Sequence, residues 1–206
     1  MSFPTVWLYD FSGDSHTLPE LRALLGGQRY SYCSNMKNET AALRSAYAFL
    51  LLRYALKKEY GVTEIPTFTF NEYGKPFLKE RPDLFFSLSH SGKRVVCAVD
   101  IAPVGADIQD IRDISLRTGE KFLEPNEYNI FSRITDEKKL SYELSMIWCV
   151  KESYGKMTGK GFGEGFRSFS AEDLLLSEQT AFVTERDGFF ISVCTERKRN
   201  GRELNV

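Results

Sequence analysis

Two segments that lie far apart in the chain carry oxygen ligands and a lysine at spacings that suit one site. In the first segment, Asp107 and Gln109 stand two apart, so an extended strand would turn both side chains to the same face. In the second, Glu152 and Lys156 stand four apart and share one face of a helix. Hard oxygen ligands hold Mg²⁺ and a lysine meets phosphate, so the two segments together predict a magnesium-diphosphate site of the kind that phosphoryl transfer requires.

Three further residues could contact an anion, and each also has a plainer interpretation. His90 follows a predicted strand in a serine-rich turn, where it could bind phosphate or be an ordinary surface histidine. Lys75 stands in a Gly-Lys-Pro turn that could be only a solvated hairpin loop. Arg44 could extend from a core face of its helix with its charged end in solvent, or it could direct its planar guanidinium group toward a phosphate. A nucleophile pair of Ser89 and His90 is disfavoured, because adjacent residues on a strand point to opposite faces.

The pair Glu152 and Lys156 could equally be an exposed ion pair on a helix surface. Trp148 lies on the same stripe, however, and places a large aromatic ring beside the supposed solvent face, which favours a functional face. The run Gly159-Lys160-Gly161 that follows permits close approach of the backbone. It does not have the spacing of a nucleotide-binding glycine loop and does not follow a strand, so neither a Rossmann nor a P-loop site is predicted.

The elements that must position these residues alternate between strands and helices. Periodicity, caps and turn residues predict strands near residues 5–9, 67–70, 85–88, 95–101, 104–108, 181–183 and 189–193, and helices over 18–25, from 38 to about 58, over 116–123, from 125 and over 137–157. Pro103 interrupts the pattern, and a similar order of elements recurs after it. The sequence therefore predicts an α+β protein of two lobes, residues 1–103 and 104–206.

Composition narrows the class of protein. The 206 residues, 42% hydrophobic and 27% charged, are typical of a globular protein, and a net charge of −1 argues against nucleic acid as a partner. The four cysteines lie far apart with no CxxC pair, which predicts reduced thiols and a cytoplasmic location. The N-terminus does not have the pattern of a signal peptide, and Arg53 interrupts the longest apolar segment, so neither secretion nor a membrane span is expected.

With these residues the chain resembles the surfactin-synthetase type of 4′-phosphopantetheinyl transferases. The resemblance is carried, in order and over most of the chain, by the segments Arg44 to Arg53, Tyr73 to Pro76, Phe86 to Ser91, Val104 to Gln109, Lys121 to Tyr128 and Trp148 to Gly161. Each segment is weak alone, but their order and spacing together are specific. The resemblance implies a pseudo-twofold monomer of two lobes, each a small, mostly antiparallel sheet with a long helix, and coenzyme A in the cleft between them.

The resemblance also implies the reaction, in which the phosphopantetheine arm of coenzyme A passes to a serine of an acyl or peptidyl carrier protein. By position, it implies catalytic roles for Glu152, Lys156 and His90, a Mg²⁺ ion on Asp107, Glu152 and Gln109, and coenzyme A contacts from Arg44, Lys75, Pro76, Ser89, His90, Asp107 and Lys156. It further implies that the segment Ile111 to Tyr128 docks the carrier protein, with Ile114, Leu116 and Phe122 either meeting a partner helix or packing in the core.

Two departures from the family leave alternatives open. Gln109 stands where the family usually has a second acid, so we expect weaker metal affinity, and a non-catalytic descendant that binds coenzyme A or a carrier protein is the main alternative. The basic residues that the family uses at the nucleotide 3′-phosphate are poorly matched, Arg29 being the nearest candidate. A metal-dependent phosphohydrolase is a further alternative, which dependence on a protein acceptor would distinguish.

Overall fold

The N-terminal half of the chain contains one long helix and two antiparallel sheets. The computed structural model describes residues 4–160, 164–177 and 179–198, so Gly161 of the predicted glycine-rich run lies outside the described residues. The elements of this half are β1 (Thr5–Asp10), α1 (Arg22–Ser34), α2 (Glu39–Tyr60), β2 (Phe68–Phe70), β3 (Pro76–Leu78), β4 (Phe85–Ser91) and β5 (Arg94–Asp100).

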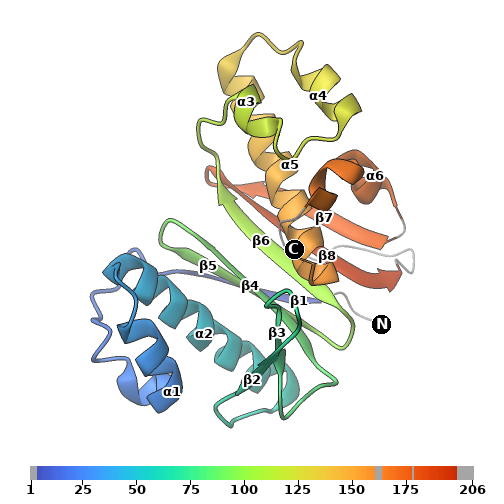
Figure 1. The fold of residues 1–206 in the computed structure, drawn as a ribbon. Helices are drawn as coiled ribbons and strands as arrows, with labels where there is room; N and C mark the ends of the chain where they lie inside the picture. The colour runs from blue at the N-terminus through green and yellow to red at the C-terminus, as the bar shows by residue number, and fades with distance from the viewer. Residues whose placement is uncertain (1–3, 161–163, 178, 199–206) are drawn as a thin grey trace.

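The C-terminal half repeats the pattern of a strand, a long helix and a terminal hairpin (Figure 1). Its elements are β6 (Val104–Asp110), α3 (Leu116–Gly119), α4 (Pro125–Phe131), α5 (Glu137–Thr158), the 3₁₀ helix η1 (Glu164–Ser168), α6 (Ala171–Leu176), β7 (Gln179–Arg186) and β8 (Phe189–Lys198). The sheet orders are β1-β5-β4 in the first half and β6-β8-β7 in the second. In both, the first strand pairs with the last strand of the hairpin, and all pairs are antiparallel. The predicted α+β class with two similar halves is therefore confirmed.

Both long helices begin and end within two residues of the bounds that the sequence predicts. The side chain of Asn38 caps α2 by accepting from the Ala41 amide, and Gly61 ends it in the left-handed conformation at φ 68°. Asp136 caps α5, and Gly159 ends it at φ 72°. These local signals explain why two helices of 22 residues each could be located from sequence alone.

Two shorter helices differ from the prediction. The helix predicted over 18–25 begins only at Arg22, and it does end at the predicted glycines, since Gly26 takes the non-helical angles φ 74° and ψ 163°; a second helical stretch follows this kink and runs to Ser34. A Cβ at Gly26 would lie 2.9 Å from the Ile65 side chain, so the glycine serves close packing as well as the kink. The helix predicted to run to Leu123 ends at Gly119, where an added Cβ would lie 3.1 Å from the side chains of Leu123 and Leu144.

Helix α5 packs very closely against β6 at Gly105. A Cβ on this glycine would lie 1.9 Å from the Ser153 carbonyl oxygen and 2.4 Å from the Met157 amide nitrogen. Both atoms belong to the backbone of α5, so no side chain could move aside. The absence of a side chain at Gly105 therefore sets the distance between β6 and α5, and with it the distance between the polar residues that the two elements carry.

The two halves meet along β4 and β6, each of which is the edge strand of its own sheet. Serine hydroxyls from alternate positions of β4 join the strands: Ser87 accepts from the Ala106 amide at 2.9 Å, and Ser91 accepts from the Asp110 amide at 3.1 Å. A shared apolar cluster lies behind this contact, with Val96 and Ala98 of β5 against Val104, Ala106 and Ile108 of β6.

Ion pairs join the halves at both ends of this contact. Arg94 bonds to Asp10 of its own half and to Asp110 of the other at 3.1 Å. At the opposite end, Asp100 is buried and pairs with Arg197 of β8. None of the helices in the described part of the chain is long and apolar enough to cross a membrane.

Candidate functional site

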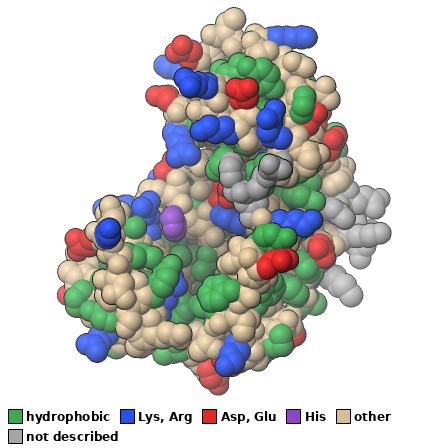
Figure 2. Space-filling view, in the orientation of Figure 1, with side chains coloured by type: hydrophobic (Ala, Val, Ile, Leu, Met, Phe, Trp, Pro, Cys, Tyr) green, Lys and Arg blue, Asp and Glu red, His purple; other side chains and the backbone are tan. Residues whose placement is uncertain are grey.

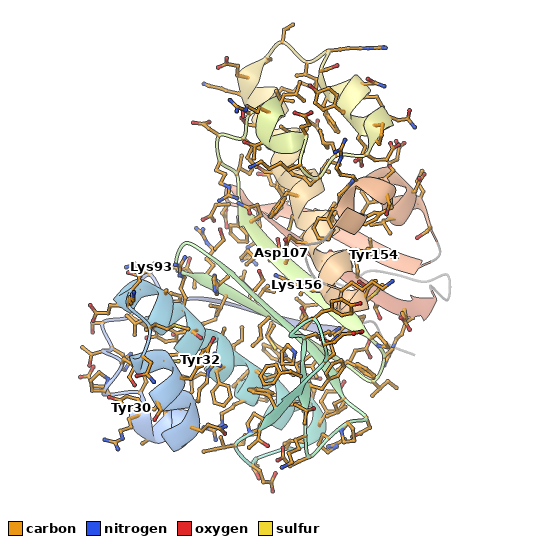
Figure 3. All side chains as sticks on the ribbon, in the orientation of Figure 1. Tyr30, Tyr32, Lys93, Asp107, Tyr154 and Lys156 are labelled. Carbon is orange, nitrogen blue, oxygen red and sulfur yellow. The ribbon has the colours of Figure 1, made fainter. Side chains whose placement is uncertain are left out.

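Asp107, Lys156 and Ser89 form a hydrogen-bonded group at the contact between the halves. The Asp107 Oδ1 atom accepts from the Lys156 ammonium at 2.7 Å and from the Ser89 hydroxyl at 2.6 Å, and Lys156 lies 2.9 Å from the same hydroxyl. The three residues come from β6, α5 and β4, and Figure 3 shows Asp107 and Lys156 facing each other where the halves meet. The fold thus joins the two remote segments that the sequence singles out.

Glu152 lies one helical turn before Lys156 and is half-buried. Burial raises the pKa of its carboxyl group, the Lys156 ammonium lowers it, and the negative charge of Asp107 raises it again. The charges of both Asp107 and Lys156 thus act on the Glu152 carboxyl group. A cation beside the two carboxyl groups would favour their charged forms.

Gln109 is buried and follows Asp107 on the same face of β6. Its side-chain nitrogen donates to the backbone carbonyl of Asp110 at 2.8 Å. This bond orients the amide and leaves its oxygen available as a neutral ligand. Among the described residues, no group of three His, Cys, Asp or Glu side chains has the arrangement of a metal site, so any cation here would depend on this amide, on water or on substrate oxygens as well.

His90 and Arg44 lie near each other on the N-terminal side of the site. His90 lies in β4 with an exposed side chain, but the surrounding protein still desolvates its ring; this desolvation, followed by the positive charge of Arg44, lowers the pKa of His90, and Lys156 contributes more weakly in the same direction. The Arg44 Nε atom is buried and has no hydrogen-bond partner among the described residues. An anion between these groups would supply an acceptor for Arg44 and would favour the charged form of His90.

Lys75 reaches from the turn before β3 to the C-terminal end of α5 in the other half. Its ammonium donates to the Met157 carbonyl at 2.8 Å, and the neighbouring Asn71 donates to the Gly159 carbonyl at 3.1 Å. These carbonyls are among those that a helix leaves unpaired at its end. In this structure Lys75 therefore caps α5, whereas Pro76, which follows it, begins β3.

The first prediction concerns the pH dependence of stability. Burial lowers the pKa of Lys75 from an ordinary value of 10.5 to about 8. Between these values the unfolded chain binds the proton more tightly, so the free energy of unfolding should rise with pH from about 8 to about 10.5 on account of this group. Thermal unfolding at pH 7.5, 9 and 10.5 should show this gain in the native protein and not in Lys75→Met. Parallel curves for the two proteins would contradict the assignment.

Arg29, the nearest candidate for a 3′-phosphate contact, is partly engaged within the N-terminal half, and its buried Nε atom has no hydrogen-bond partner among the described residues. Its guanidinium donates to the carbonyl and hydroxyl oxygens of Ser45 at 2.9 and 2.7 Å and lies over the rings of Tyr32 and Phe49. These contacts hold α1 against α2. The structure therefore gives Arg29 a structural role in the N-terminal half.

Three apolar residues of the segment from Ile111 to Tyr128 could have met a partner helix or packed in the core. Ile114 and Phe122 are buried in the core of the C-terminal half, and Leu116 packs against it while partly exposed. The core interpretation therefore holds for the first two.

Several residues of the site were not recognised in the sequence. Ser87 and Ser91 support the strand that carries Asp107, and their alternation with Ser89 was a readable signal of one polar face on a strand. Gly105 and Asn71 gave no signal, because their roles depend on a backbone that lies far away in the sequence.

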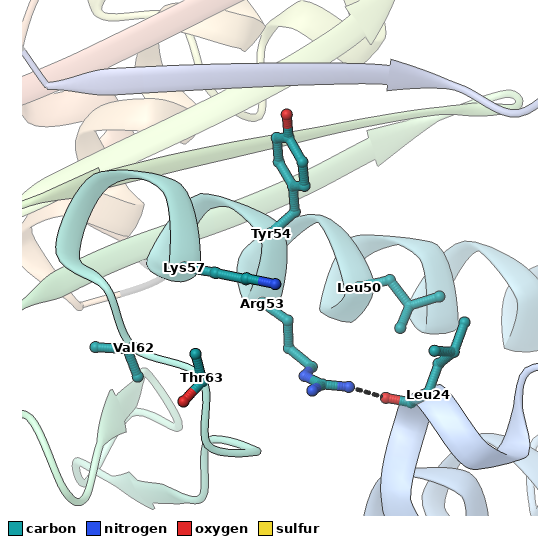
Figure 4. A pocket seen from close by; sticks show the side chains of 7 residues that line it. All are labelled: Leu24, Leu50, Arg53, Tyr54, Lys57, Val62 and Thr63. Atoms are coloured by element: carbon teal, nitrogen blue, oxygen red, sulfur yellow. Dashed lines mark hydrogen bonds between the residues drawn. The ribbon is translucent and has the colours of Figure 1, made fainter.

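A pocket of about 280 Å³ lies between α1, α2 and the segment after α2 (Figure 4). Its walls include Leu24, Leu50 and Tyr54, and Arg53 donates across it to the Leu24 carbonyl. None of the predicted site residues lines it.

Comparison with known proteins places this chain in a family. The model of the 4′-phosphopantetheinyl transferase superfamily matches residues 103–204, which include β6 and α5. A 4′-phosphopantetheinyl transferase from Bacillus subtilis is 32% identical over 151 residues, 73% of this chain and 67% of the relative. The 4′-phosphopantetheinyl transferase gsp from Aneurinibacillus migulanus is 34% identical over 157 residues, 76% of this chain and 65% of the relative. The corresponding protein psf-1 from Bacillus pumilus is 37% identical over 131 residues, 63% and 56% of the two chains.

The fold consists of two α+β halves, and acidic and basic side chains meet between them. The chain belongs to the 4′-phosphopantetheinyl transferase superfamily, as the resemblance predicted. It spans about two thirds of the length of the first two of these relatives.

Proposed function

We propose that this protein transfers the 4′-phosphopantetheine arm of coenzyme A to a serine hydroxyl of an acyl or peptidyl carrier protein, releasing adenosine 3′,5′-bisphosphate. The observation that carries the proposal is the contact of Asp107 with Lys156, which joins two segments that are far apart in the sequence, in a chain whose relatives are named 4′-phosphopantetheinyl transferases. The serine oxygen forms a bond to the phosphorus that bears the pantetheine, and the anhydride bond to the nucleotide breaks.

We place coenzyme A between the lobes formed by residues 1–103 and 104–206. On the N-terminal side, Arg44 and His90 would bind phosphate, supported by the unpartnered Arg44 Nε and by the influence of Arg44 on His90. Lys75 and Pro76 would contact the nucleotide end from their turn. For Lys75 this requires its ammonium to share the Met157 carbonyl with the ligand or to leave it.

Mg²⁺ is the cation that fits the donors of the site. Asp107, Glu152 and the Gln109 amide oxygen would hold it, because hard oxygen ligands suit Mg²⁺, which also retains water and substrate oxygens. The ion pair of Asp107 with Lys156, and the influence of both charges on the pKa of the Glu152 carboxyl group, support this placement. When bound, Mg²⁺ would neutralise charge on the diphosphate.

The residues of the chain account for the remaining steps. Lys156 lies where it can exchange its bond to Asp107 for one to a diphosphate oxygen, and Ser89 holds the Asp107 carboxylate while this happens. Glu152 would accept the proton of the attacking serine, directly or through a water; burial raises the pKa of its carboxyl group in the metal-free protein, whereas a bound Mg²⁺ would lower it. The reaction then needs no covalent enzyme intermediate.

Incubation with coenzyme A, MgCl₂ and several apo carrier proteins, followed by intact mass measurement of each carrier, tests the proposal. We expect at least one carrier to gain the mass of the phosphopantetheine arm. Coenzyme A binding without any such gain would favour the non-catalytic alternative, to which Gln109 gives some support. Release of phosphopantetheine without a carrier would favour a phosphohydrolase. We further propose that the protein works as a monomer in the cytoplasm, consistent with four free, buried cysteines.

The second prediction concerns the metal requirement. Gln109→Glu adds a third carboxylate beside Asp107 and Glu152, so the variant should reach half-maximal activity at an about tenfold lower Mg²⁺ concentration, corresponding to one charge-assisted ligand. Activity titrated with MgCl₂ measures this. Identical curves for the two proteins would remove residue 109 from the metal site.

A further inference from the structure

The turn between β2 and β3 crosses from the N-terminal half to the C-terminal end of α5. Asn71 begins this turn, and its Oδ1 atom accepts from the backbone amides of Tyr73 and Lys75 at 3.0 and 2.8 Å, which closes the turn. Its Nδ2 atom donates to the Gly159 carbonyl, 88 residues later, at 3.1 Å. Figure 1 shows the β2-β3 hairpin directed toward this end of α5. One side chain therefore both closes the turn and joins it to the other half.

The two polar atoms of Asn71 serve different purposes. An aspartate or a serine at this position could close the same turn, because both accept hydrogen bonds from nearby backbone amides. Asparagine adds an amide nitrogen, and here that nitrogen donates to the other half of the protein. Turn formation alone does not account for this second bond.

The end of α5 is shaped to receive the turn. Its carbonyls are among those that a helix leaves unpaired, so the Gly159 carbonyl is free to accept from Asn71. Gly159 has no side chain, and a Cβ there would lie 2.9 Å from the Lys75 side chain and 3.1 Å from the Asn71 Nδ2 atom. The glycine that ends the helix at φ 72° thus also lets the turn lie directly against it.

Two side chains hold the turn on α5, and the proposed function uses one of them for the ligand. Lys75 donates to the Met157 carbonyl, a bond that its ammonium would share with coenzyme A or give up. The bond from Asn71 to Gly159 involves no charged group and would remain. Because Gly159 lies three residues after Lys156, this bond fixes the turn about one helical turn from the proposed diphosphate contact.

This spacing matters for a ligand that contacts both halves. Figure 2 shows that the molecule narrows where the halves meet, with basic side chains on both sides of the narrowing. Coenzyme A held there would meet Lys75 from the N-terminal half and Lys156 from the C-terminal half. A turn that is already fixed in place saves the free energy of ordering it when the ligand binds.

We propose that Asn71 is a positioning residue for coenzyme A, holding the turn that carries Lys75 against the end of α5 while the Lys75 ammonium turns to the ligand. This inference rests on the proposed function. It assigns Asn71 no contact with coenzyme A, with the metal or with the reacting atoms.

The test compares Asn71→Ser with a control in the same hairpin. Serine keeps an acceptor for the turn and adds no charge, but its side chain is too short to reach the Gly159 carbonyl. The control, Thr67→Val, removes a hydroxyl that donates to the Glu80 carboxylate at 2.5 Å at the opposite end of the hairpin. Isothermal titration calorimetry in MgCl₂ measures the Kd of coenzyme A, steady-state kinetics measure the KM of the carrier, and thermal unfolding measures the stability of each variant.

We expect Asn71→Ser to raise the Kd of coenzyme A about fivefold or more, the effect of one lost hydrogen bond, and to leave the KM of the carrier within about twofold. Thr67→Val should leave both within about twofold. An unchanged Kd in Asn71→Ser overturns the inference. An equal rise in Thr67→Val also overturns it, because any weakening of the hairpin would then have the same effect.

A double-mutant cycle tests whether Asn71 acts through Lys75. When Lys75 is already replaced in Lys75→Met, adding Asn71→Ser should raise the Kd less than about twofold further. An equal effect in both backgrounds would show that Asn71 acts independently of Lys75 and would overturn the inference. If Lys75→Met does not fold, the comparison of Asn71→Ser with Thr67→Val decides. Native protein that binds coenzyme A and modifies no carrier would overturn the proposed transfer, and the Kd comparison would still decide the role of Asn71.

Discussion

Lys156→Ala should lower kcat/KM for carrier modification by roughly 100- to 1000-fold, the effect typical of removing a positioned charge from a developing oxyanion. In the structure, the Lys156 ammonium is bonded to the Asp107 carboxylate at 2.7 Å and to the Ser89 hydroxyl at 2.9 Å. Its loss removes the cation of the cluster and leaves Asp107 with Ser89 as its remaining side-chain donor. Kinetics with saturating MgCl₂ measure the loss.

A matched control is available on the same helix. Lys138 is exposed in the first turn of α5, and Lys138→Ala removes the same charge at the opposite end. It should leave kcat/KM within about twofold of the native value, since exposed charges contribute little. Lys156→Ala with activity equal to that of the control would show that this lysine takes no part in the transfer.

Gly105→Ala should be the most disruptive of the glycine-to-alanine substitutions near the site. Its Cβ would lie 1.9 Å from the Ser153 carbonyl oxygen, so α5 must move away from β6. We expect a loss of about 3 kcal/mol or more in the free energy of unfolding, at the upper end for overpacking. Because Asp107 and Lys156 lie on the two elements that separate, activity should also fall by about 100-fold.

The control for this substitution is Gly13→Ala, where a Cβ would meet no atom within 4 Å. Urea unfolding of both variants measures stability. A Gly105→Ala protein as stable and active as Gly13→Ala would show that β6 and α5 are not held together as the structure has them.

Local signals predicted much of the fold because they act within a few residues. The caps Asn38 and Asp136 and the end glycines Gly61 and Gly159 each determine a helix boundary through bonds to neighbouring backbone. For the same reason the alternation of Asp107 and Gln109 was sufficient to place both on one face of a strand.

What the sequence did not show depends on contacts over long distances along the chain. For Lys75 the sequence offered a solvated loop residue or a contact to an anion, yet its ammonium meets a carbonyl of α5 that lies 82 residues later. Lys151 lay next to a predicted site residue and gave no indication of burial, because its four oxygen partners come from segments that only the folded chain assembles.

The contact between β4 and β6 also bears on how the protein avoids self-association. Each strand ends its own sheet, and an uncovered edge offers unpaired backbone groups to any other strand. Here the hydroxyls of Ser87 and Ser91 take up the amides of Ala106 and Asp110, so each edge shields the other. Either half produced separately would expose such an edge, and aggregation rather than a soluble half-protein is the expected result.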